Sequence, residues 1–245
     1  MDTRPSRLTA KTILVTGAGR GIGRAIANSL AAEGADVILS GRNLDRLHQT
    51  ADAIREAGGR AHVFQADIGE EDQVLDLFRH IQGRFERLDV LVNNAGIGEY
   101  GPLAEFPTDS FDRIMRVNLR GTFLCCREAV KLMLPQKAGT IINISSVVGF
   151  KGYPNQSAYA ASKHAIMGLT KALAVEAQPH GIRVSAVLPG GVDTDLVAES
   201  RPDLDRACLI APEDIAETVL FLLTLSDRAA VDQIFIRRAN STPFP

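Results

Sequence analysis

The sequence predicts an α/β protein built on one doubly wound parallel sheet of about seven strands, with helices on both faces. Two observations carry this prediction: short apolar segments alternate with longer segments of helical periodicity, and the alternation runs along nearly the whole chain. Strands and helices in such alternation form right-handed βαβ units, which pair their strands in parallel. No linker rich in Pro, Gly or Ser divides the 245 residues, so we expect one domain over 1–245, with irregular ends at 1–10 and 239–245.

The strands are predicted from short runs of apolar, mostly β-branched residues. The run Ile141, Ile142 and Ile144, for example, is short and stops at Ser145 and Ser146. On this basis we expect strands at 12–16, 36–40, 62–65, 90–93, 141–144, 183–188 and 234–236.

The helices are predicted from apolar residues at helical spacing and from the residues that stop them. Gly34 and Gly58 end two of these segments, and Pro135 is expected to end a third. Pro212 opens the last one, with two acids in its first turn. The expected helices run from the glycine-rich segment to 33, then over 44–57, 70–82, 109–134, 157–177 and 212–225.

Composition argues against several kinds of partner. The chain is 45% hydrophobic and 23% charged, with a net charge of −2, which argues against nucleic acid and against an anionic membrane surface. Cys125, Cys126 and Cys208 form neither a disulfide framework nor a zinc-spaced cluster, so we expect small core hydrophobes and no metal. Residues 1–11 are polar and show no signal segment, and no apolar run is long enough to span a bilayer, which predicts a cytoplasmic protein.

Four glycines stand between the first predicted strand and the first helix, at Gly17, Gly19, Gly21 and Gly23. Glycine lets a ligand approach the backbone closely, and a helix N-terminus offers unpaired N–H groups and a positive dipole end to a pyrophosphate. A plain βα turn needs fewer glycines. We therefore interpret this segment, with Arg20 and Ile22 inside it, as a dinucleotide-binding loop.

Tyr159 and Lys163 lie four residues apart on the predicted helix 157–177, so their side chains share one face about 6 Å apart along the axis. A free tyrosine has a pKa of about 10, and a nearby ammonium favours the phenolate and lowers that pKa. Such a tyrosine can give or take a proton during a reaction, and a serine hydroxyl at the end of strand 141–144 can bond the same oxygen. The alternative is a surface tyrosine beside a solvated lysine, and the spacing alone does not decide between the two.

Five motifs spread along the chain together resemble the short-chain dehydrogenase/reductase family, whose fold is Rossmann-like. They are Thr-Gly-x-x-x-Gly-x-Gly from Thr16, Asn93-Asn-Ala-Gly96 after the fourth strand, Asn118 within Val-Asn-Leu, Ser146 thirteen residues before Tyr159 with Lys163, and Pro189-Gly-Gly-Val-Asp-Thr194 after the sixth strand. The resemblance covers about 11–225, and a chance match at all five places is not credible.

The resemblance implies a role for each position. It makes Tyr159 the general acid that protonates a carbonyl oxygen, and Lys163 the ligand of the nicotinamide ribose that also lowers the tyrosine pKa. Ser146 would orient the substrate oxygen, and Asn118 would hold a water of the proton relay. Ser145 is the weaker serine candidate, because the family spacing selects Ser146. The further positions implied for the cofactor are Asp67 and Ile68 at the adenine, Asn94, Ala95, Gly96, Val192 and Thr194 at the ribose and nicotinamide, and Pro189 and Gly190 with them.

The end of the second strand predicts NADP rather than NAD. NAD sites place an acid there, about twenty residues past the glycine loop, to bind the ribose 2′-OH. Here the strand ends in Ser40-Gly41-Arg42-Asn43, whereas Asp36 begins it and Asp45 lies in the next helix. Arg42, with Ser40 beside it, can instead meet the 2′-phosphate of NADP. Arg20 is a second candidate for that phosphate, and the alternative is that both arginines are merely solvated.

We therefore expect an NADP-dependent oxidoreductase that transfers a hydride between nicotinamide and a carbonyl/alcohol substrate, with Tyr159 as general acid/base. A 3-oxoacyl thioester, a steroid, a sugar and a small ketone all stay open as substrates. One alternative is a dinucleotide-sensing regulator on the same fold, against which the intact Asn118, Ser146, Tyr159 and Lys163 argue. Another is a sugar-nucleotide epimerase or dehydratase. Those relatives usually run longer, and their glycine loop resembles Thr-Gly-x-x-Gly-x-x-Gly, which this chain does not show.

The resemblance also bears on assembly. In the family, the helices that begin near Asp109 and Ser157 often pair with their symmetry mates, and both segments here are apolar over more than one face. This predicts a homo-oligomer, a tetramer or a dimer. Family members often end in a glycine-rich segment, whereas 232–245 contain no glycine, so the usual C-terminal subunit contact is not expected here.

Overall fold

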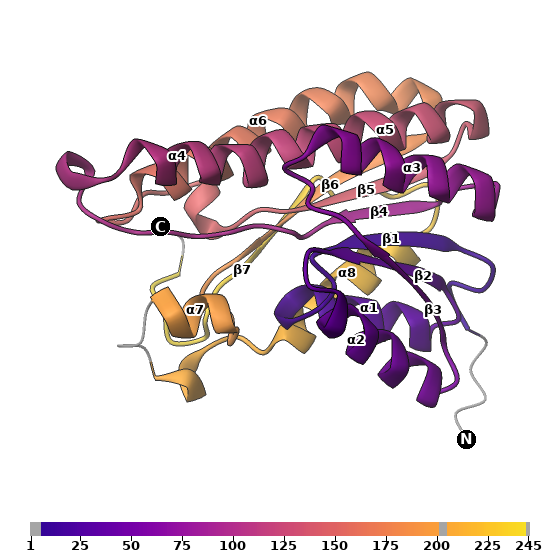
Figure 1. Ribbon diagram of the computed structural model, residues 1–245, viewed down its shortest axis with the longest axis horizontal. Coiled ribbons are helices and arrows are strands. Elements are labelled where there is room, and N and C mark those ends of the chain that lie inside the picture. The colour runs from indigo at the N-terminus through magenta and orange to yellow at the C-terminus, as the bar shows by residue number, and fades with distance from the viewer. Residues whose placement is uncertain (1–5, 201–204, 244–245) are drawn as a thin grey trace.

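The core of the fold is a seven-stranded sheet in which every neighbouring pair of strands is parallel. The computed structural model describes residues 6–200 and 205–243. The strands are β1 (Thr12–Thr16), β2 (Asp36–Gly41), β3 (Arg60–Gln65), β4 (Val90–Asn93), β5 (Gly139–Ile144), β6 (Ile182–Pro189) and β7 (Gln233–Ile236). They stand side by side in the order β3-β2-β1-β4-β5-β6-β7 (Figure 1). The predicted fold class is confirmed, and no strand end differs from its predicted place by more than two residues.

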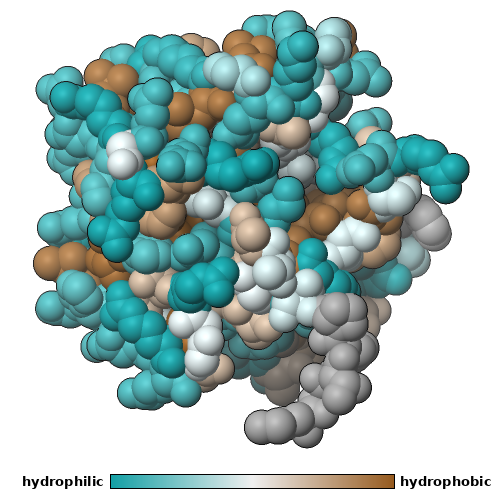
Figure 2. Space-filling view, turned by 90° about the vertical axis from the view of Figure 1, so that its right-hand side faces the viewer, coloured by the Kyte–Doolittle hydropathy of each residue, from teal (hydrophilic) through white to brown (hydrophobic). Residues whose placement is uncertain are grey.

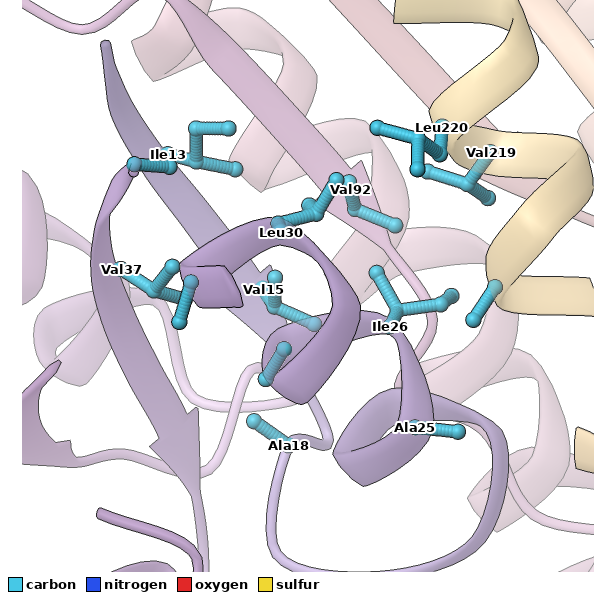
Figure 3. Close-up of a cluster of buried hydrophobic side chains, with 14 of the residues drawn as sticks. Ile13, Val15, Ala18, Ala25, Ile26, Leu30, Val37, Val92, Val219 and Leu220 are labelled. Carbon is cyan, nitrogen blue, oxygen red and sulfur yellow. The ribbon is translucent and has the colours of Figure 1, made fainter. Parts of the chain in front are cut away.

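Helices cover both faces of this sheet (Figure 1). One face carries α1 (Gly21–Ala32), α2 (Leu44–Glu56) and α8 (Pro212–Thr224), and the other carries α3 (Glu71–Phe85), α4 (Thr108–Ile114), α5 (Thr122–Gln136) and α6 (Ser157–Ala177). Successive residues of a strand point to opposite faces, so Ile13 and Val15 pack toward α1 while Leu14 packs toward α3 and α5. Figure 3 shows the first of these cores, where Leu30 of α1 and Val219 of α8 meet the strands. Both faces of each inner strand are buried, as expected for a parallel sheet.

The helix predicted over 109–134 is not one regular helix. It contains α4, then a π-helical segment at Met115–Gly121, then α5. The Thr122 hydroxyl donates to the Asn118 carbonyl at 2.7 Å, which satisfies a carbonyl of the widened turn. Pro135 does not end the helix, because it lies in the last turn and the chain leaves only at Lys137, which has φ +49°.

The chain ends are irregular where the structure describes them, and the three cysteines do not share one environment. Of the predicted irregular ends, residues 1–5 and 244–245 lie outside the described residues, and 239–243 contain no helix or strand. Cys125 and Cys126 are buried as predicted, whereas Cys208 is exposed because it ends a short surface turn at Arg206–Cys208.

Figure 2 shows the face at the right of Figure 1, where hydrophilic and hydrophobic residues are interspersed. Within the described part of the chain, no helix has both the length and the apolar character to cross a membrane.

The strand order reverses between β1 and β4, and the carboxyl ends of these two strands are tied together. Chain connections leave β1 in one direction toward β2 and β3, and leave β4 in the other toward β5 to β7. Thr16 Oγ1, at the end of β1, accepts hydrogen bonds from Asn94 N at 3.0 Å and Ala95 N at 3.1 Å. Ligands of open α/β sheets bind in the crevice at such a switch point.

Candidate active site

The loop between β1 and α1 keeps its backbone open to a ligand. Gly17 has φ +67° and Gly21 has φ +52°, a region that side chains rarely adopt. A Cβ at Gly17 would lie 2.9 Å from the Ala95 Cα, and one at Gly23 would overlap the Gly17 carbonyl oxygen. Larger residues at these positions would therefore push apart the loop, the start of α1 and the end of β4.

The first turn of α1 faces the same space with unused backbone donors. Within 20–24, Arg20 holds the N-cap position in an extended conformation, its side chain makes no capping bond, and no acid follows it. The first N–H groups of a helix have no partner inside the helix, and they carry the positive end of its dipole. A pyrophosphate binds at such a terminus, so the residues present here fit a dinucleotide.

Three arginines stand at the outer end of this space. Arg20 Nη1 lies 3.1 Å, and Arg46 Nη1 lies 3.7 Å, from one carboxylate oxygen of Asp195, which opens the short helix α7 (Asp195–Ser200). Arg42 follows β2, where Gln65 Nε2 donates to its backbone carbonyl at 2.8 Å. Its guanidinium has no ion-pair or hydrogen-bond partner within 6–200 and 205–243. Arg20 and Arg46 therefore share the Asp195 carboxylate, and Arg42 adds a third cation to this part of the cavity wall.

Arg46 is a cation that the sequence did not single out. It lies in the first turn of α2, where its N–H donates to the side chain of the N-cap residue Asn43 at 2.9 Å. A Cβ on Gly19 would come within 3.1 Å of the Arg46 Cβ, so α2 begins directly beside the glycine loop. No acid occupies the NAD position, because Asp36 lies at the far end of β2, where its carboxylate bonds His62 Nε2 at 2.6 Å.

Tyr159, Lys163 and Ser146 are all buried and border one cavity. Lys163 Nζ donates to the Ile144 carbonyl at 3.1 Å and lies 5.7 Å from the centroid of the Tyr159 ring. Ser146 follows β5, and its hydroxyl donates to the Pro189 carbonyl at 3.4 Å. The i, i+4 spacing on α6 thus brings tyrosine and lysine together, and the end of β5 supplies the serine opposite them.

The neighbouring Ser145 is occupied elsewhere. Its hydroxyl donates to the Lys163 carbonyl at 3.2 Å and is packed against Gly149, where a Cβ would come within 2.5 Å of it. This bond anchors the strand end to α6. Of the two serines, Ser146 is the one that lowers the pKa of Tyr159.

Burial shifts both ionisable groups of this pair toward their neutral forms. Burial raises the pKa of Tyr159 well above its ordinary value, the nearby Tyr100 raises it further, and the bond with Ser146 lowers it in part. Burial also lowers the pKa of Lys163 to about 8. The predicted lowering of the tyrosine pKa is wrong for this structure, because the cost of burying a phenolate raises the pKa of Tyr159 and Lys163 is not among the groups that lower it.

Asn118 lies in the π-helical segment, next to the site but away from its cavity. Its Nδ2 donates to the Ile97 carbonyl at 2.9 Å and to Ser162 Oγ at 3.1 Å, while its Oδ1 accepts from Ile97 N at 2.8 Å. Ser162 Oγ in turn donates to the Tyr159 carbonyl at 2.8 Å. The side chain therefore ties the loop after β4 to α6, and its role in holding a water stays a prediction.

A cavity of about 1060 Å³ joins the glycine loop to Tyr159. The predicted residues on its wall are Gly17, Gly19, Arg20, Gly21, Ile22, Arg42, Asp67, Ile68, Asn94, Ala95, Gly96, Ser146, Tyr159, Lys163, Pro189, Gly190, Val192 and Thr194. Gly23, Ser40 and Asn118 do not border it. Ser40 is fully buried within β2, and Gly23 serves the contact between α1 and the loop.

The far end of the cavity is built from residues that carry no sequence motif. The rings of Tyr100 and Tyr159 meet edge to face at 5.5 Å, and those of Phe150 and Phe235 at 5.3 Å. The segment after β7 completes the wall with Arg237, Arg238, Ser241, Thr242 and Pro243. Only the folded chain brings the segment after β7 to this place, so no local signal predicts it. Within the described residues, no group of three or more His, Cys, Asp or Glu is placed to hold a metal.

The chain is similar in sequence to known short-chain dehydrogenases. Residues 11–205 match the family model described as short chain dehydrogenase. A 3beta-hydroxysteroid dehydrogenase of Mediterraneibacter gnavus is 46% identical over 199 residues, which cover 81% of this chain and 72% of that protein. A 3-oxoacyl-[acyl-carrier-protein] reductase of Synechocystis sp. is 41% identical over 226 residues, which cover 89% of this chain and 90% of that protein.

A solved structure shows the same fold. A metagenomic short-chain oxidoreductase in complex with NADP is 34% identical to this chain, with a TM-score of 0.85, and the match covers 96% of this chain and 100% of that one. The fold, the family model and these relatives define the class of the protein as an oxidoreductase. The chain belongs to the short-chain dehydrogenase/reductase family.

Proposed function

We propose that this protein is an NADP-dependent oxidoreductase that interconverts a carbonyl compound and its alcohol. The observation that carries the proposal is the single cavity that joins an uncapped helix N-terminus and three arginines to a buried tyrosine–lysine–serine group. The solved relative in complex with NADP supports the choice of cofactor.

The binding residues follow from the geometry of the wall. Backbone N–H groups at the start of α1 would hold the pyrophosphate. Arg42 and Arg46, with Arg20, would meet the 2′-phosphate, for which a guanidinium suits by charge and by its paired donors. Asp67 and Ile68 would contact the adenine, and Lys163 the nicotinamide ribose. The nicotinamide, when bound, supplies or accepts the hydride.

Tyr159 would transfer the proton. Burial keeps its hydroxyl protonated, so in the reduction direction it would give that proton to the carbonyl oxygen while a hydride reaches the carbonyl carbon. Ser146 would donate a hydrogen bond to the same oxygen and so fix its position. The Lys163 ammonium, with one hydrogen bond to the Ile144 carbonyl, has donors left for a ribose and would favour the phenolate that forms.

Asn118 would support the reaction without touching the substrate. Its bonds to Ile97 and Ser162 hold the loop after β4 against α6, and we propose that Asn118 holds a water of the proton relay. This role rests on the position of Asn118 behind Lys163, since a Cβ on Gly96 would lie 3.3 Å from Asn118 Oδ1 and 3.7 Å from Lys163 Nζ.

We also propose that the protein works as a homo-oligomer with one catalytic domain per chain. The apolar side chains Phe111 and Phe123, on α4 and α5, are 40% and 46% exposed, and Met115, Leu119, Phe123 and Leu169 line one shallow apolar hollow. Sedimentation should give a dimer or tetramer at micromolar concentration, and Phe123→Glu should shift it toward monomer. A stable wild-type monomer would refute the proposed oligomer.

The cytoplasmic location predicted from the sequence stays a prediction.

An assay of NADPH oxidation over a panel of carbonyl compounds tests the central proposal. The panel should contain 3-oxoacyl thioesters, steroid ketones, sugars and small ketones, with NADH run in parallel. We expect carbonyl-dependent oxidation of NADPH with at least one class. Tight binding of NADPH without oxidation by any of them would favour the dinucleotide-sensing regulator instead.

A further inference from the structure

The wall of the cavity carries far more positive than negative charge. Its basic residues are Arg20, Arg42, Arg46, Lys151, Lys163, Arg237 and Arg238, and its acids are Asp67 and Asp195. The chain as a whole has a net charge of −2, so this excess belongs to the cavity and not to the protein in general. A cavity lined by one sign of charge attracts ligands of the opposite sign.

The proposed cofactor accounts for only one end of this charge. Arg20, Arg42 and Arg46 stand at the glycine loop, and Lys163 at the tyrosine. Neither acid of the wall pairs with the cations at the end near Lys151 and the segment after β7. Asp195 pairs with Arg20 and Arg46, and Asp67 accepts a hydrogen bond within its own turn from Gly69 N at 2.9 Å. Three cations remain at the other end, on Lys151 and on the segment after β7, without a described acid beside them.

The segment after β7 is held in a defined turn. Gly190 N donates to the Ile236 carbonyl at 2.7 Å, which joins the end of β7 to the end of β6. Arg237 Nη1 then donates to the carbonyls of Arg238, Ala239 and Ser241 at 3.0, 3.1 and 2.8 Å. The guanidinium of Arg237 is thus used to shape the turn, which makes it a positioning residue.

Arg238 is left as the ligand-facing cation of this turn. Its backbone carbonyl accepts from Ser241 N at 3.0 Å and Ser241 Oγ at 2.8 Å, so its backbone is fixed. Its stem packs over Gly191, where a Cβ would lie 3.7 Å from Arg238 Cδ. The side chain is half-buried, and its guanidinium has no partner among residues 6–200 and 205–243. A partly buried charge is costly unless an opposite charge joins it.

Gly191, over which the stem of Arg238 packs, relates Arg238 to Ser146. Gly191 comes two residues after Pro189, whose carbonyl accepts the Ser146 hydroxyl at 3.4 Å. The Phe150 and Phe235 rings, which meet at 5.3 Å, border the same cavity as Ser146 and Arg238 and give it an apolar wall. A molecule whose carbonyl reaches Ser146 can lay an apolar portion on these rings and place a further group within reach of Arg238.

We propose that the substrate carries an anionic group, a carboxylate or a phosphate, which binds Arg238 with Lys151 as a second cation on the same wall. This inference rests on the proposed function and names its substrate class: carbonyl compounds in which an apolar segment separates the carbonyl from the anion. Lys151 Nζ lies 5.4 Å from the centroid of the Tyr153 ring, and no carboxylate in the described part of the chain pairs with it. A guanidinium binds either anion by paired hydrogen bonds.

Pairs of substrates that differ only in charge test this proposal. The first pair is 4-oxocyclohexanecarboxylate and its methyl ester, and the second is 4-oxocyclohexyl phosphate and 4-hydroxycyclohexanone. Each is assayed with NADPH on wild type, Arg238→Leu, Arg238→Lys and a matched control, Arg228→Leu, whose arginine is exposed and does not border the cavity. The pair whose anionic and neutral members differ more in kcat/KM shows whether the site prefers a carboxylate or a phosphate.

We expect the wild type to favour the anionic member of a pair by roughly ten- to a hundred-fold in kcat/KM, as for a charge-assisted hydrogen bond. Arg238→Leu should remove this preference through KM and leave the neutral member and the Kd of NADPH nearly unchanged. Arg238→Lys should restore part of the preference, and Arg228→Leu should keep all of it.

Three results would overturn the proposal: equal use of both members by the wild type, equal loss on both members in Arg238→Leu, or weaker NADPH binding in that variant. If neither member of either pair is reduced, the proposed function fails on these compounds, and binding decides the inference separately. Calorimetry would then compare cyclohexanecarboxylate with cyclohexanecarboxamide. Tighter binding of the carboxylate that is lost in Arg238→Leu would support the anion site, and equal binding would refute it.

Discussion

The two ends of the cavity are built in different ways. The proposed cofactor end uses backbone groups and the carboxyl ends of β1, β2 and β4, which the sheet itself holds in register. The proposed substrate end uses side chains from a loop at Tyr100, the turn at Phe150 and the segment after β7. One end therefore depends on the fold, and the other on segments that can change without disturbing it. Relatives that share one fold can therefore act on different substrates.

The largest effect on turnover should come from a substitution at Tyr159, where the two ends of the cavity meet. Tyr159→Phe removes the proposed proton donor and leaves the cofactor end intact. General acid–base catalysis contributes about 10²–10⁴-fold, so turnover with NADPH should fall at least that far while the Kd of NADPH hardly changes. Tyr153→Phe, at a half-exposed tyrosine of the same cavity, is the control. Turnover within a few-fold of wild type would show that Tyr159 is not the acid.

The next effect concerns the pH dependence of the same group. Burial lowers the pKa of Lys163 to about 8, so its ammonium is present below that pH and is lost as the pH rises through it. NADPH-dependent reduction by the wild type should therefore fall above about pH 8, since the ammonium supports both the ribose and the developing phenolate. Rates and NADPH binding are measured across the pH range.

Lys163→Met should weaken NADPH binding, lower the rate and remove this basic limb. Lys171→Met, at an exposed lysine two turns further along α6, should do none of these. A Lys163→Met protein with normal NADPH binding and an unchanged pH profile would contradict the dual role of the lysine.

The smallest effect is expected at the outer cofactor end. A charge-assisted hydrogen bond contributes about 1.5–3 kcal/mol, or roughly ten- to a hundred-fold in affinity, so NADPH should bind at least tenfold more tightly than NADH. Arg42→Asp should shrink or reverse this preference, because a carboxylate repels the 2′-phosphate and accepts the 2′-OH. Titration at low salt measures both cofactors, with Arg79→Asp on α3 as the control. Equal affinities of the wild type would refute the assignment.

Sequence and structure agree best where local chemistry determines position. The glycine loop, the strand ends and the spacing of Tyr159 and Lys163 were all predictable, because each depends on backbone period or on the conformational freedom of glycine. Arg46 was not, because its place beside Gly19 depends on how α2 packs against the loop. The π-helical segment around Asn118 also escaped prediction, since apolar periodicity does not distinguish it from a regular helix.

The raised pKa of Tyr159 shows a further limit. Spacing on a helix brings a lysine close, but it does not reveal how deeply both side chains are buried or that Tyr100 lies against the ring. The segment after β7 is the clearest case, because an irregular tail gives no sign that it closes a cavity. Burial and long-range placement are properties of the packed chain.

The central claim is that hydride passes between nicotinamide and a carbonyl carbon within this cavity. The most direct test incubates the wild type with NADPH that carries deuterium at the transferable position of the nicotinamide, together with a ketone from the panel, and analyses the alcohol by mass spectrometry and NMR. We predict deuterium on the carbinol carbon of the product, and at least about a hundredfold less labelled product when Tyr159→Phe replaces the wild type over the same time. NADPH that binds but leaves every carbonyl of the panel unlabelled and unreduced would contradict the account.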